Sequence, residues 1–155
     1  MRILKEMIVL GSAHATSTAP PRAFFERWAD MDTWPEWDEA IEWVRRDGPF
    51  AEGTTGSLKP RGGPKVSFLI ETLVPDREFT DRSSMLGAAL VIRHLTEVGE
   101  DGRTTVDIVV SIAGPLARLW KVFIGRGIGE STPAGLRRLV EMAEAVPGGE
   151  TAAER

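Results

Sequence analysis

The stretch AGPLARLWKVFIGRGIGESTPAGLRRLVEMAEA, residues 113–145, has the pattern of one long helix with a buried face. Its apolar residues recur at the spacing i, i+3, i+4, i+7, which is typical of an amphipathic helix. Gly114-Pro115 marks the start, because proline suits the first turn, and Pro147-Gly148-Gly149 marks the end. The apolar face comprises Leu116, Leu119, Trp120, Phe123, Ile124, Ile128, Leu136, Leu139, Val140 and Ala143.

The middle of this helix carries three glycines at spacing two, residues 125, 127 and 129, and then Pro133. Pro133 has no N–H to donate to the carbonyl of Gly129. We therefore expect a kink there, or a break with Thr132 as a new N-cap. The glycines predict a flexible segment that opens one end of the fold for ligand entry. As a nucleotide site the segment is weak, because no strand precedes it.

The chain before this helix is predicted to be rich in strands. Two short helices follow the first strand, one at 18–30 with Thr18 as N-cap, the other opening on Thr33-Trp34-Pro35-Glu36 as a capping box. Short turns then join successive strands, which indicates an antiparallel meander. The predicted strands are 6–17, 41–46, 54–60, 65–74, 78–85, 90–98 and 104–113. This order, β-α-α-β-β-β-β-β-β-α, predicts an α+β domain at 1–147 in which the long helix covers a sheet; we expect a disordered tail at 148–155.

Composition excludes several classes of function. The formal net charge of −4 argues against a nucleic-acid or anionic-membrane surface. The absence of cysteine excludes disulfides and thiolate sites. The two histidines lack ligand spacing, so neither a metal nor another cofactor is expected. Residues 1–15 resemble a signal peptide, but Glu6 and a short apolar core disfavour that interpretation. No segment approaches the roughly 20 apolar residues of a membrane span, and we expect a cytoplasmic protein.

His94 is the most informative polar residue. In strand 90–98, Arg93 and Glu97 favour solvent, which places His94 on the inner face. If residues 86–89 form the preceding turn, Asp81 faces His94 and Ser83 faces Ile92. A buried histidine most often serves packing. The alternative is acid/base catalysis, with Asp81 orienting the ring.

Other polar and aromatic groups leave alternatives open. Three tryptophans, at 34, 37 and 43, either fill the core or line a pocket. Four acidic residues at 36, 38, 39 and 42 are interpreted as a solvated helix face, with Glu36 as a cap. Arginines 45, 82 and 93 are weak candidates for binding a substrate carboxylate, and Arg93 points outward by alternation. In the first strand, Leu10, Ser12, His14 and Thr16 share a face, but alternation does not say which face is inside.

The chain resembles the START/Bet v1-like helix-grip superfamily, in particular the bacterial polyketide cyclase/dehydrase and lipid-transport (SRPBCC) group. The matching pieces lie at 17–20, 28–30 with Trp34 and Trp37, 48–53, 75–79, 102–104 and 114–117, and so span nearly the whole chain. The resemblance implies a seven-stranded antiparallel sheet curled around the C-terminal helix, with a cavity for a hydrophobic ligand between them. Similar cyclases use Arg, Tyr, His and ordered water. This chain has no tyrosine, and His94 with Asp81 and Ser83 is the nearest substitute.

Two functions are expected from these observations. The first is binding of a hydrophobic small molecule with cyclisation or dehydration of a polyketide-like substrate, for which His94 and Asp81 are the catalytic candidates. The alternative is a non-catalytic carrier or sensor of a lipid, quinone or similar molecule; an interaction domain is a third, less favoured class. A homodimer stays open as well. The residues expected to bind the ligand are Trp37, Trp43, Phe68, Ile70, Thr72, Ser83, Ile92, Val110, Trp120, Phe123, Ile124 and Ile128.

Overall fold

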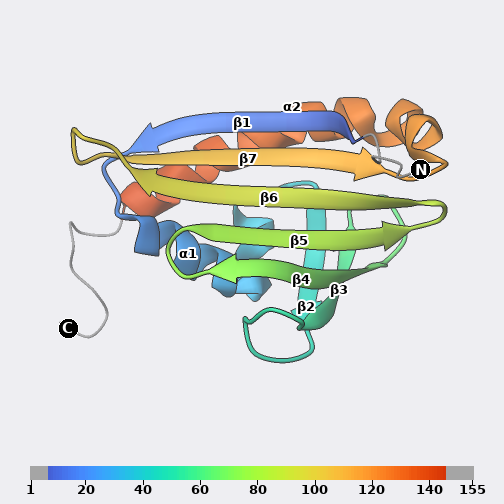
Figure 1. Cartoon of the computed structure of the whole chain (residues 1–155), viewed down its shortest axis with the longest axis horizontal. Coiled ribbons are helices and arrows are strands. Elements are labelled where there is room, and N and C mark those ends of the chain that lie inside the picture. The colour runs from blue at the N-terminus through green and yellow to red at the C-terminus, as the bar shows by residue number, and fades with distance from the viewer. Residues whose placement is uncertain (1–6, 146–155) are drawn as a thin grey trace, which may run out of the picture.

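A seven-stranded antiparallel sheet curls around a long C-terminal helix in the computed structural model, which describes residues 7–145 (Figure 1). The strand order β1-β7-β6-β5-β4-β3-β2 follows the chain from β2 to β7 and places β1 beside β7. The predicted fold class is therefore confirmed. The elements are β1 (Ile8–Ser17), α1 (Pro21–Ala29), the 3₁₀-helix η1 (Met31–Glu36), β2 (Ile41–Arg46), β3 (Thr55–Pro60), β4 (Val66–Val74), β5 (Glu78–Met85), β6 (Ala88–Val98), β7 (Thr104–Ala113) and α2 (Ala117–Glu144).

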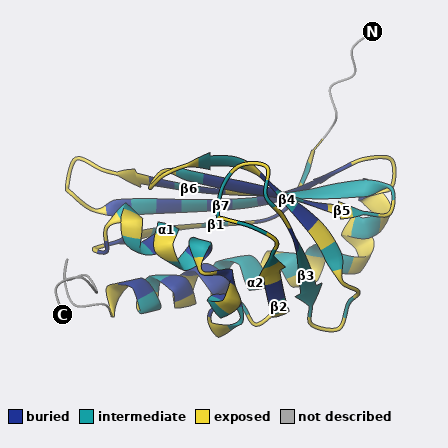
Figure 2. Cartoon of the chain, turned by 90° about the horizontal axis from the view of Figure 1, so that it is seen from below, coloured by how far each residue is buried: buried dark blue, intermediate teal, exposed yellow. Residues whose placement is uncertain are grey.

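The helices all lie on the concave side of the sheet. Figure 2 shows α1 and α2 beneath β1, β6 and β7, while β2 and β3 curl down to the level of α2. The main core joins α1, η1 and the C-terminal half of α2 to the sheet, around Trp28, Phe79 and Leu139. A smaller cluster, built on Leu10, Ile112 and Ala117, lies under the N-terminal half of α2. The two halves of α2 are thus anchored in different clusters.

The helix α2 runs without interruption through Pro133. The predicted break with Thr132 as N-cap is wrong, because the Thr132 hydroxyl donates backward to the carbonyl of Ile128 at 2.7 Å. Gly129 is exposed, so water can bond the carbonyl that Pro133 leaves without a donor. The start of the helix also differs, since Pro115 precedes the N-cap residue Leu116.

The two predicted caps of the short helices are wrong as well. Helix α1 begins after Pro20, with Pro21 in its first turn and no side-chain cap, so Thr18 lies outside it. Thr33 lies inside η1 and donates its hydroxyl to the carbonyl of Asp30 at 2.7 Å. Neither threonine accepts a backbone N–H as a cap would.

A bulge settles which face of β1 is buried. Ser12, His14 and Thr16 are exposed, whereas Leu10 is buried, because the pairing of β1 with β7 shifts between Val9 and Gly11. Leu10 therefore leaves the face predicted by simple alternation. Residues 1–6 and 146–155, including the predicted tail and the first part of the signal-like segment, lie outside the described residues.

Candidate ligand cavity

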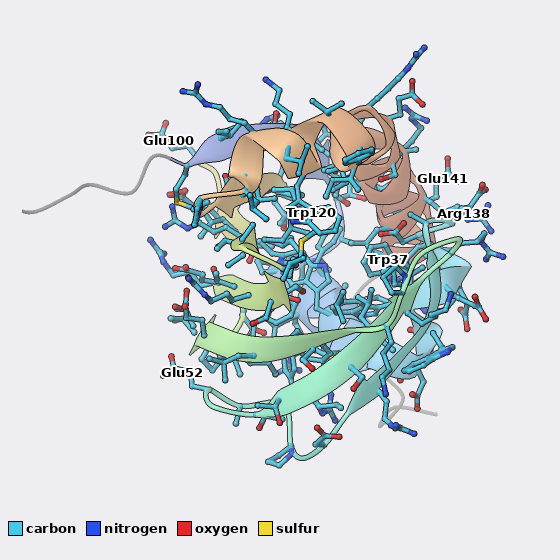
Figure 3. The ribbon with its side chains drawn as sticks, turned by 90° about the vertical axis from the view of Figure 1, so that its right-hand side faces the viewer. Trp37, Glu52, Glu100, Trp120, Arg138 and Glu141 are labelled. Carbon is cyan, nitrogen blue, oxygen red and sulfur yellow. The ribbon has the colours of Figure 1, made fainter. Side chains whose placement is uncertain are left out.

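A cavity of about 590 Å³ lies between the concave face of the sheet and α2, which lines it from Trp120 to Leu136. Figure 3 looks into this end of the molecule, with Trp120 of α2 and Trp37 on two sides of the hollow. Most of the exposed residues of its wall lie on the β3–β4 turn, within residues 61–65, and at Ser84 and Leu86, so the cavity opens at this end of the sheet. Its lining is predominantly apolar, with Asp81, Ser83, His94, Ser131 and Thr132 among the few polar members.

Seven of the predicted ligand-binding residues line this cavity, together with both catalytic candidates, His94 and Asp81. The strands contribute three of the seven and α2 contributes three more. Trp37, which follows η1, completes the set, and both it and Trp34 are buried as well as cavity-lining. The seven are Trp37, Ser83, Ile92, Val110, Trp120, Ile124 and Ile128.

Five predicted wall residues do not reach the cavity. Phe68 and Ile70 are buried in the main core instead. Thr72 follows a bulge in β4, after which Leu73 rather than Thr72 packs against the core. Trp43 lies on the other side of β2, with the guanidinium of Arg45 5.7 Å from its ring centroid.

Phe123 is the fifth, and 72% of it is exposed. One step along a helix turns a side chain by 100°, so Phe123 points away where Ile124 points in. The helical pattern of apolar residues did not distinguish the two.

The sequence did not predict that the β3–β4 turn forms part of the cavity wall. Its composition indicated only a turn, and nothing local shows that the curl of the sheet brings it toward α2. Strand alternation could have found Leu90 and Ile108, which share a face with the predicted neighbours Ile92 and Val110. Ser131 and Thr132 gave no signal beyond their place beside Pro133.

The predicted pairing of Asp81 with His94 is wrong. The β5–β6 turn is only Leu86-Gly87, with Gly87 at φ 67, so β6 begins two residues earlier than predicted. Asp81 therefore pairs with Ile92, and His94 pairs with Phe79. A shift of two residues keeps every side chain on its predicted face, which is why both groups still line the cavity.

His94 is held by the core rather than by a carboxylate. Its Nδ1 donates to the carbonyl of Phe79 at 2.8 Å, and its ring stacks on the Phe79 ring at 4.7 Å between centroids. The Trp28 ring packs against it at 4.9 Å. Burial lowers the pKa of His94 to about 4, although the bond to Phe79 acts to raise it. The imidazole is therefore neutral at pH 7.

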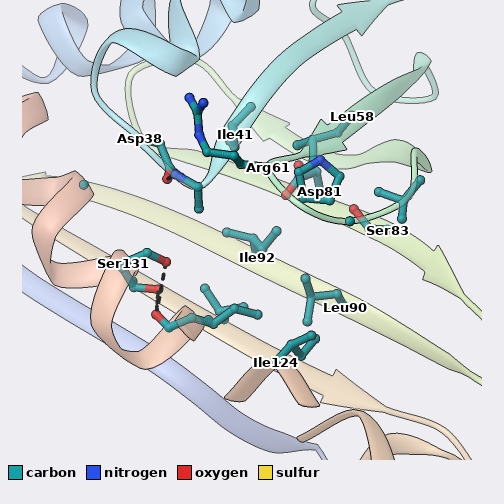
Figure 4. A pocket seen from close by; sticks show the side chains of 18 of the residues that line it. Asp38, Ile41, Leu58, Arg61, Asp81, Ser83, Leu90, Ile92, Ile124 and Ser131 are labelled. Carbon is teal, nitrogen blue, oxygen red and sulfur yellow. Dashed lines mark hydrogen bonds between the residues drawn. The ribbon is translucent and has the colours of Figure 1, made fainter. Parts of the chain in front are cut away.

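Asp81 is almost completely enclosed, with 1% of its surface exposed. Burial raises the pKa of its carboxyl to about 7, and a hydrogen bond from its own backbone N–H acts in the opposite direction. Among the described residues, its Oδ1 has no hydrogen-bond partner. Asp81 and Ser83 lie on β5, across the cavity from Ile124 and Ser131 of α2 (Figure 4). An unsatisfied buried oxygen of this kind favours a ligand that supplies a polar hydrogen.

Sequence comparison found no matching protein-family model and no significant match among curated proteins. Solved structures do match. Hypothetical protein jhp0584 from Helicobacter pylori superposes with a TM-score of 0.71 at 15% identity, over 89% of this chain and 88% of that one. Ara h 8.0201 gives a TM-score of 0.61 at 15% identity, over 90% and 98%. This chain has the Bet v1-like helix-grip fold.

The same helix-grip fold occurs in StfQ, a di-domain ARO/CYC protein from the steffimycin biosynthetic pathway. The TM-score is 0.70 at 10% identity, over 89% of this chain, which spans about half of StfQ. At such identities the likeness shows the fold alone. The chemistry of the helix-grip cavity must therefore be argued from its own residues.

Charged groups at the mouth of this helix-grip cavity differ from those predicted. Asp38, expected on a solvated face, is half-buried and lines the cavity, and burial raises its pKa. Arg61 also lines it and donates from Nε to the carbonyl of Glu39 at 2.9 Å. Glu36 caps nothing; its Oε1 lies 3.8 Å from Arg27.

The three arginines considered as carboxylate binders lie elsewhere. Arg82 pairs with Glu71 and Arg93 pairs with Glu78, both at the surface. Arg45 covers Trp43. Among the described residues, therefore, Arg61 is the one arginine that lines the cavity.

Proposed function

We propose that this protein binds an apolar small molecule in the helix-grip cavity and acts as its carrier or sensor. The observation that carries the proposal is the cavity itself, about 590 Å³ in a chain of 155 residues. Protein interiors are close-packed and rarely keep such a volume without a use. Ligand pockets commonly span about 300–1,000 Å³ and combine apolar walls with a few polar groups.

The polar groups indicate what the ligand carries besides its apolar body. Asp81 and Ser83 are two residues apart on β5, so their side chains lie on the same face of the strand, and both are buried. A carboxyl group with a pKa of about 7 is partly protonated at neutral pH, so it can both donate and accept. We therefore expect a ligand with one hydroxyl, carbonyl or amine group near Asp81, as in a lipid alcohol or a quinone-like ring.

A second candidate function is cyclisation or dehydration of a polyketide-like substrate. The observation that favours it is the pKa of Asp81, because an acid/base group works best when its pKa lies near the working pH. Aldol closure needs one group that takes a proton from a carbon beside a carbonyl and returns one to oxygen. Asp81 suits this role better than His94, whose ring is fixed by Phe79 and Trp28. StfQ, an ARO/CYC protein, shares the fold.

Binding is tested with the apolar fluorophore N-phenyl-1-naphthylamine, excited directly. Ile92 lines the cavity, so the larger side chain of Ile92→Trp should narrow it beside Asp81 and weaken binding by about tenfold. Val91→Trp is the matched control, since Val91 is the next residue of β6 and does not line the cavity. Equal binding by all three proteins, or none by the wild type, would contradict the proposal.

Asp81→Asn separates the two candidate functions. Linear polyketide mimics are offered to the wild type and the variant, and turnover is followed together with binding. An enzyme should lose turnover by about 10²-fold or more while it still binds. A carrier should show no turnover in either protein and a change in affinity alone. His94→Gln is the companion variant, and unchanged turnover in it removes His94 from the mechanism.

A further inference from the structure

Large apolar side chains stay exposed at the end of the molecule where the cavity opens. Leu86 and Val122 are each 78% exposed, Phe123 is 72% exposed and Leu119 is 52% exposed. These four residues are called the mouth patch below. Leu119, Val122 and Phe123 lie on α2, whereas Leu86 lies in the β5–β6 turn. Trp120 of α2 links the helix to this turn, because its Nε1 donates to the carbonyl of Leu86 at 2.7 Å. Contiguous exposed apolar surface of this kind marks an interaction site.

Basic residues predominate around the mouth patch. Residues 116–129 include Arg118, Lys121 and Arg126 and no acidic residue, although the whole chain has a net charge of −4. All three basic residues are exposed. Arg61 and Lys65 add two more exposed basic groups on the β3–β4 turn, at the opposite side of the opening.

The acidic groups near this end are fewer. Glu130 lies 3.4 Å from Arg126 and pairs with it across one helical turn. Glu39 is exposed and Asp38 is half-buried. The mouth therefore keeps an excess of positive charge over its exposed carboxylates.

We propose that this end of the molecule docks on an anionic lipid membrane. A helix that exposes bulky apolar side chains among basic ones has the composition of an interfacial helix. The mouth patch would enter the boundary between headgroups and acyl chains, while Lys121 and Arg126 meet lipid phosphates. The net charge of the whole chain does not prevent this, because screening limits charge interactions to about 10 Å.

A second copy of the chain fits this surface less well. In a two-fold interface the same surface of both copies meets itself. Such an interface would thus bring the basic residues Lys121 and Arg126 of both copies onto one surface, on which each copy supplies the carboxylate of Glu130. An anionic bilayer supplies the missing charge.

Docking at this end would place the cavity opening against the bilayer. Leu86 belongs both to the mouth patch and to the cavity wall, and Trp120, which also lines the cavity, donates to the carbonyl of Leu86. An apolar ligand could then pass between bilayer and cavity without crossing water. This step rests on the proposed function, whereas membrane docking itself does not.

The test is vesicle flotation of the full chain without added ligand. Phosphatidylcholine vesicles are compared with vesicles that also contain phosphatidylglycerol. We expect the wild type to float with the anionic vesicles, to float less with the neutral ones and to be released by salt. Val122→Ser/Phe123→Ser should reduce flotation at least about tenfold, and Lys121→Glu/Arg126→Glu should abolish the preference for anionic lipid.

Matched controls lie at the other end of the sheet, on the β6–β7 turn. Val98 is 55% exposed and Arg103 is exposed, so Val98→Ser and Arg103→Glu should float like the wild type. The proposal is overturned if the wild-type protein does not float with the anionic vesicles. So does sedimentation showing a wild-type dimer that Val122→Ser/Phe123→Ser makes monomeric. Naphthylamine binding is measured on the same variants, so that failure of docking and failure of the cavity are told apart.

Discussion

Asp81 and His94 are two buried titratable groups on neighbouring strands whose pKa values shift toward opposite ends of the scale. Burial disfavours the charged form of each. It raises the pKa of Asp81 from 3.8 to about 7 and lowers that of His94 from 6.5 to about 4. Both groups are therefore uncharged over a wide range of mildly acidic pH, which suits a cavity for apolar ligands.

Their effects on stability have opposite signs. Between pH 3.8 and 7 the folded chain keeps a proton on Asp81 that the unfolded chain has lost, so the free energy of unfolding falls as pH rises. Between pH 4 and 6.5 the unfolded chain protonates His94 while the folded chain does not, so the free energy of unfolding rises with pH. Each slope is about 1.4 kcal/mol per pH unit at most.

Single substitutions should make the contribution of each group to the pH dependence of the free energy of unfolding measurable. Relative to wild type, Asp81→Asn should gain stability as pH rises from about 4 to about 7. His94→Gln should lose stability relative to wild type as pH rises from about 4 to 6.5. Urea unfolding at a series of pH values measures both differences. Differences that stay constant with pH would mean that neither group has a shifted pKa in the folded chain.

At the scale of elements, α2 packs tightly against β1 at Gly11, whereas the neighbouring helix residue Gly127 has open space around it. A Cβ placed on Gly11 would lie 2.9 Å from both the carbonyl oxygen of Ile128 and the hydroxyl of Thr132. A Cβ on Gly127 would meet nothing within 4 Å. Glycine is therefore needed at the first position for close approach, whereas at the second it only makes the helix easier to unfold.

Alanine substitutions at these two glycines should change stability in opposite directions. Gly127→Ala should raise the free energy of unfolding by about 0.5–1 kcal/mol, because alanine favours the helix. Gly11→Ala should lower it by about 1–3 kcal/mol, because the strand must move away from α2. Chemical denaturation measures both. A stabilising Gly11→Ala would show that α2 does not press on β1 as described.

The glycine-rich part of α2 should also open more readily than its ends. Amide hydrogens of residues 125–133 should exchange faster than those of 136–143, where Leu136, Leu139 and Ala143 are buried in the main core. Gly127→Ala should slow exchange in the first segment. Exchange as slow in 125–133 as in 136–143 would rule out this segment as the entry gate.

For the whole molecule, the sequence was sufficient for the fold and for part of the cavity. Alternation and turn residues are local signals, so the meander and the long helix could be predicted from them. The partner of Asp81 could not, because it depends on whether the β5–β6 turn has two residues or four. Bulges in β1 and β4 reversed the faces of Leu10 and Thr72 and could not be predicted for the same reason: they arise from strand pairing, not from local sequence.

The central claim is that the cavity holds an apolar small molecule, and native mass spectrometry tests it most directly. The protein is exposed to a lipid extract, and its native mass is compared with its denatured mass. We predict a retained small molecule in the wild type and in Val91→Trp, released on denaturation, and clearly less of it in Ile92→Trp. An empty wild type after every extract, or equal retention by Ile92→Trp, would contradict the account.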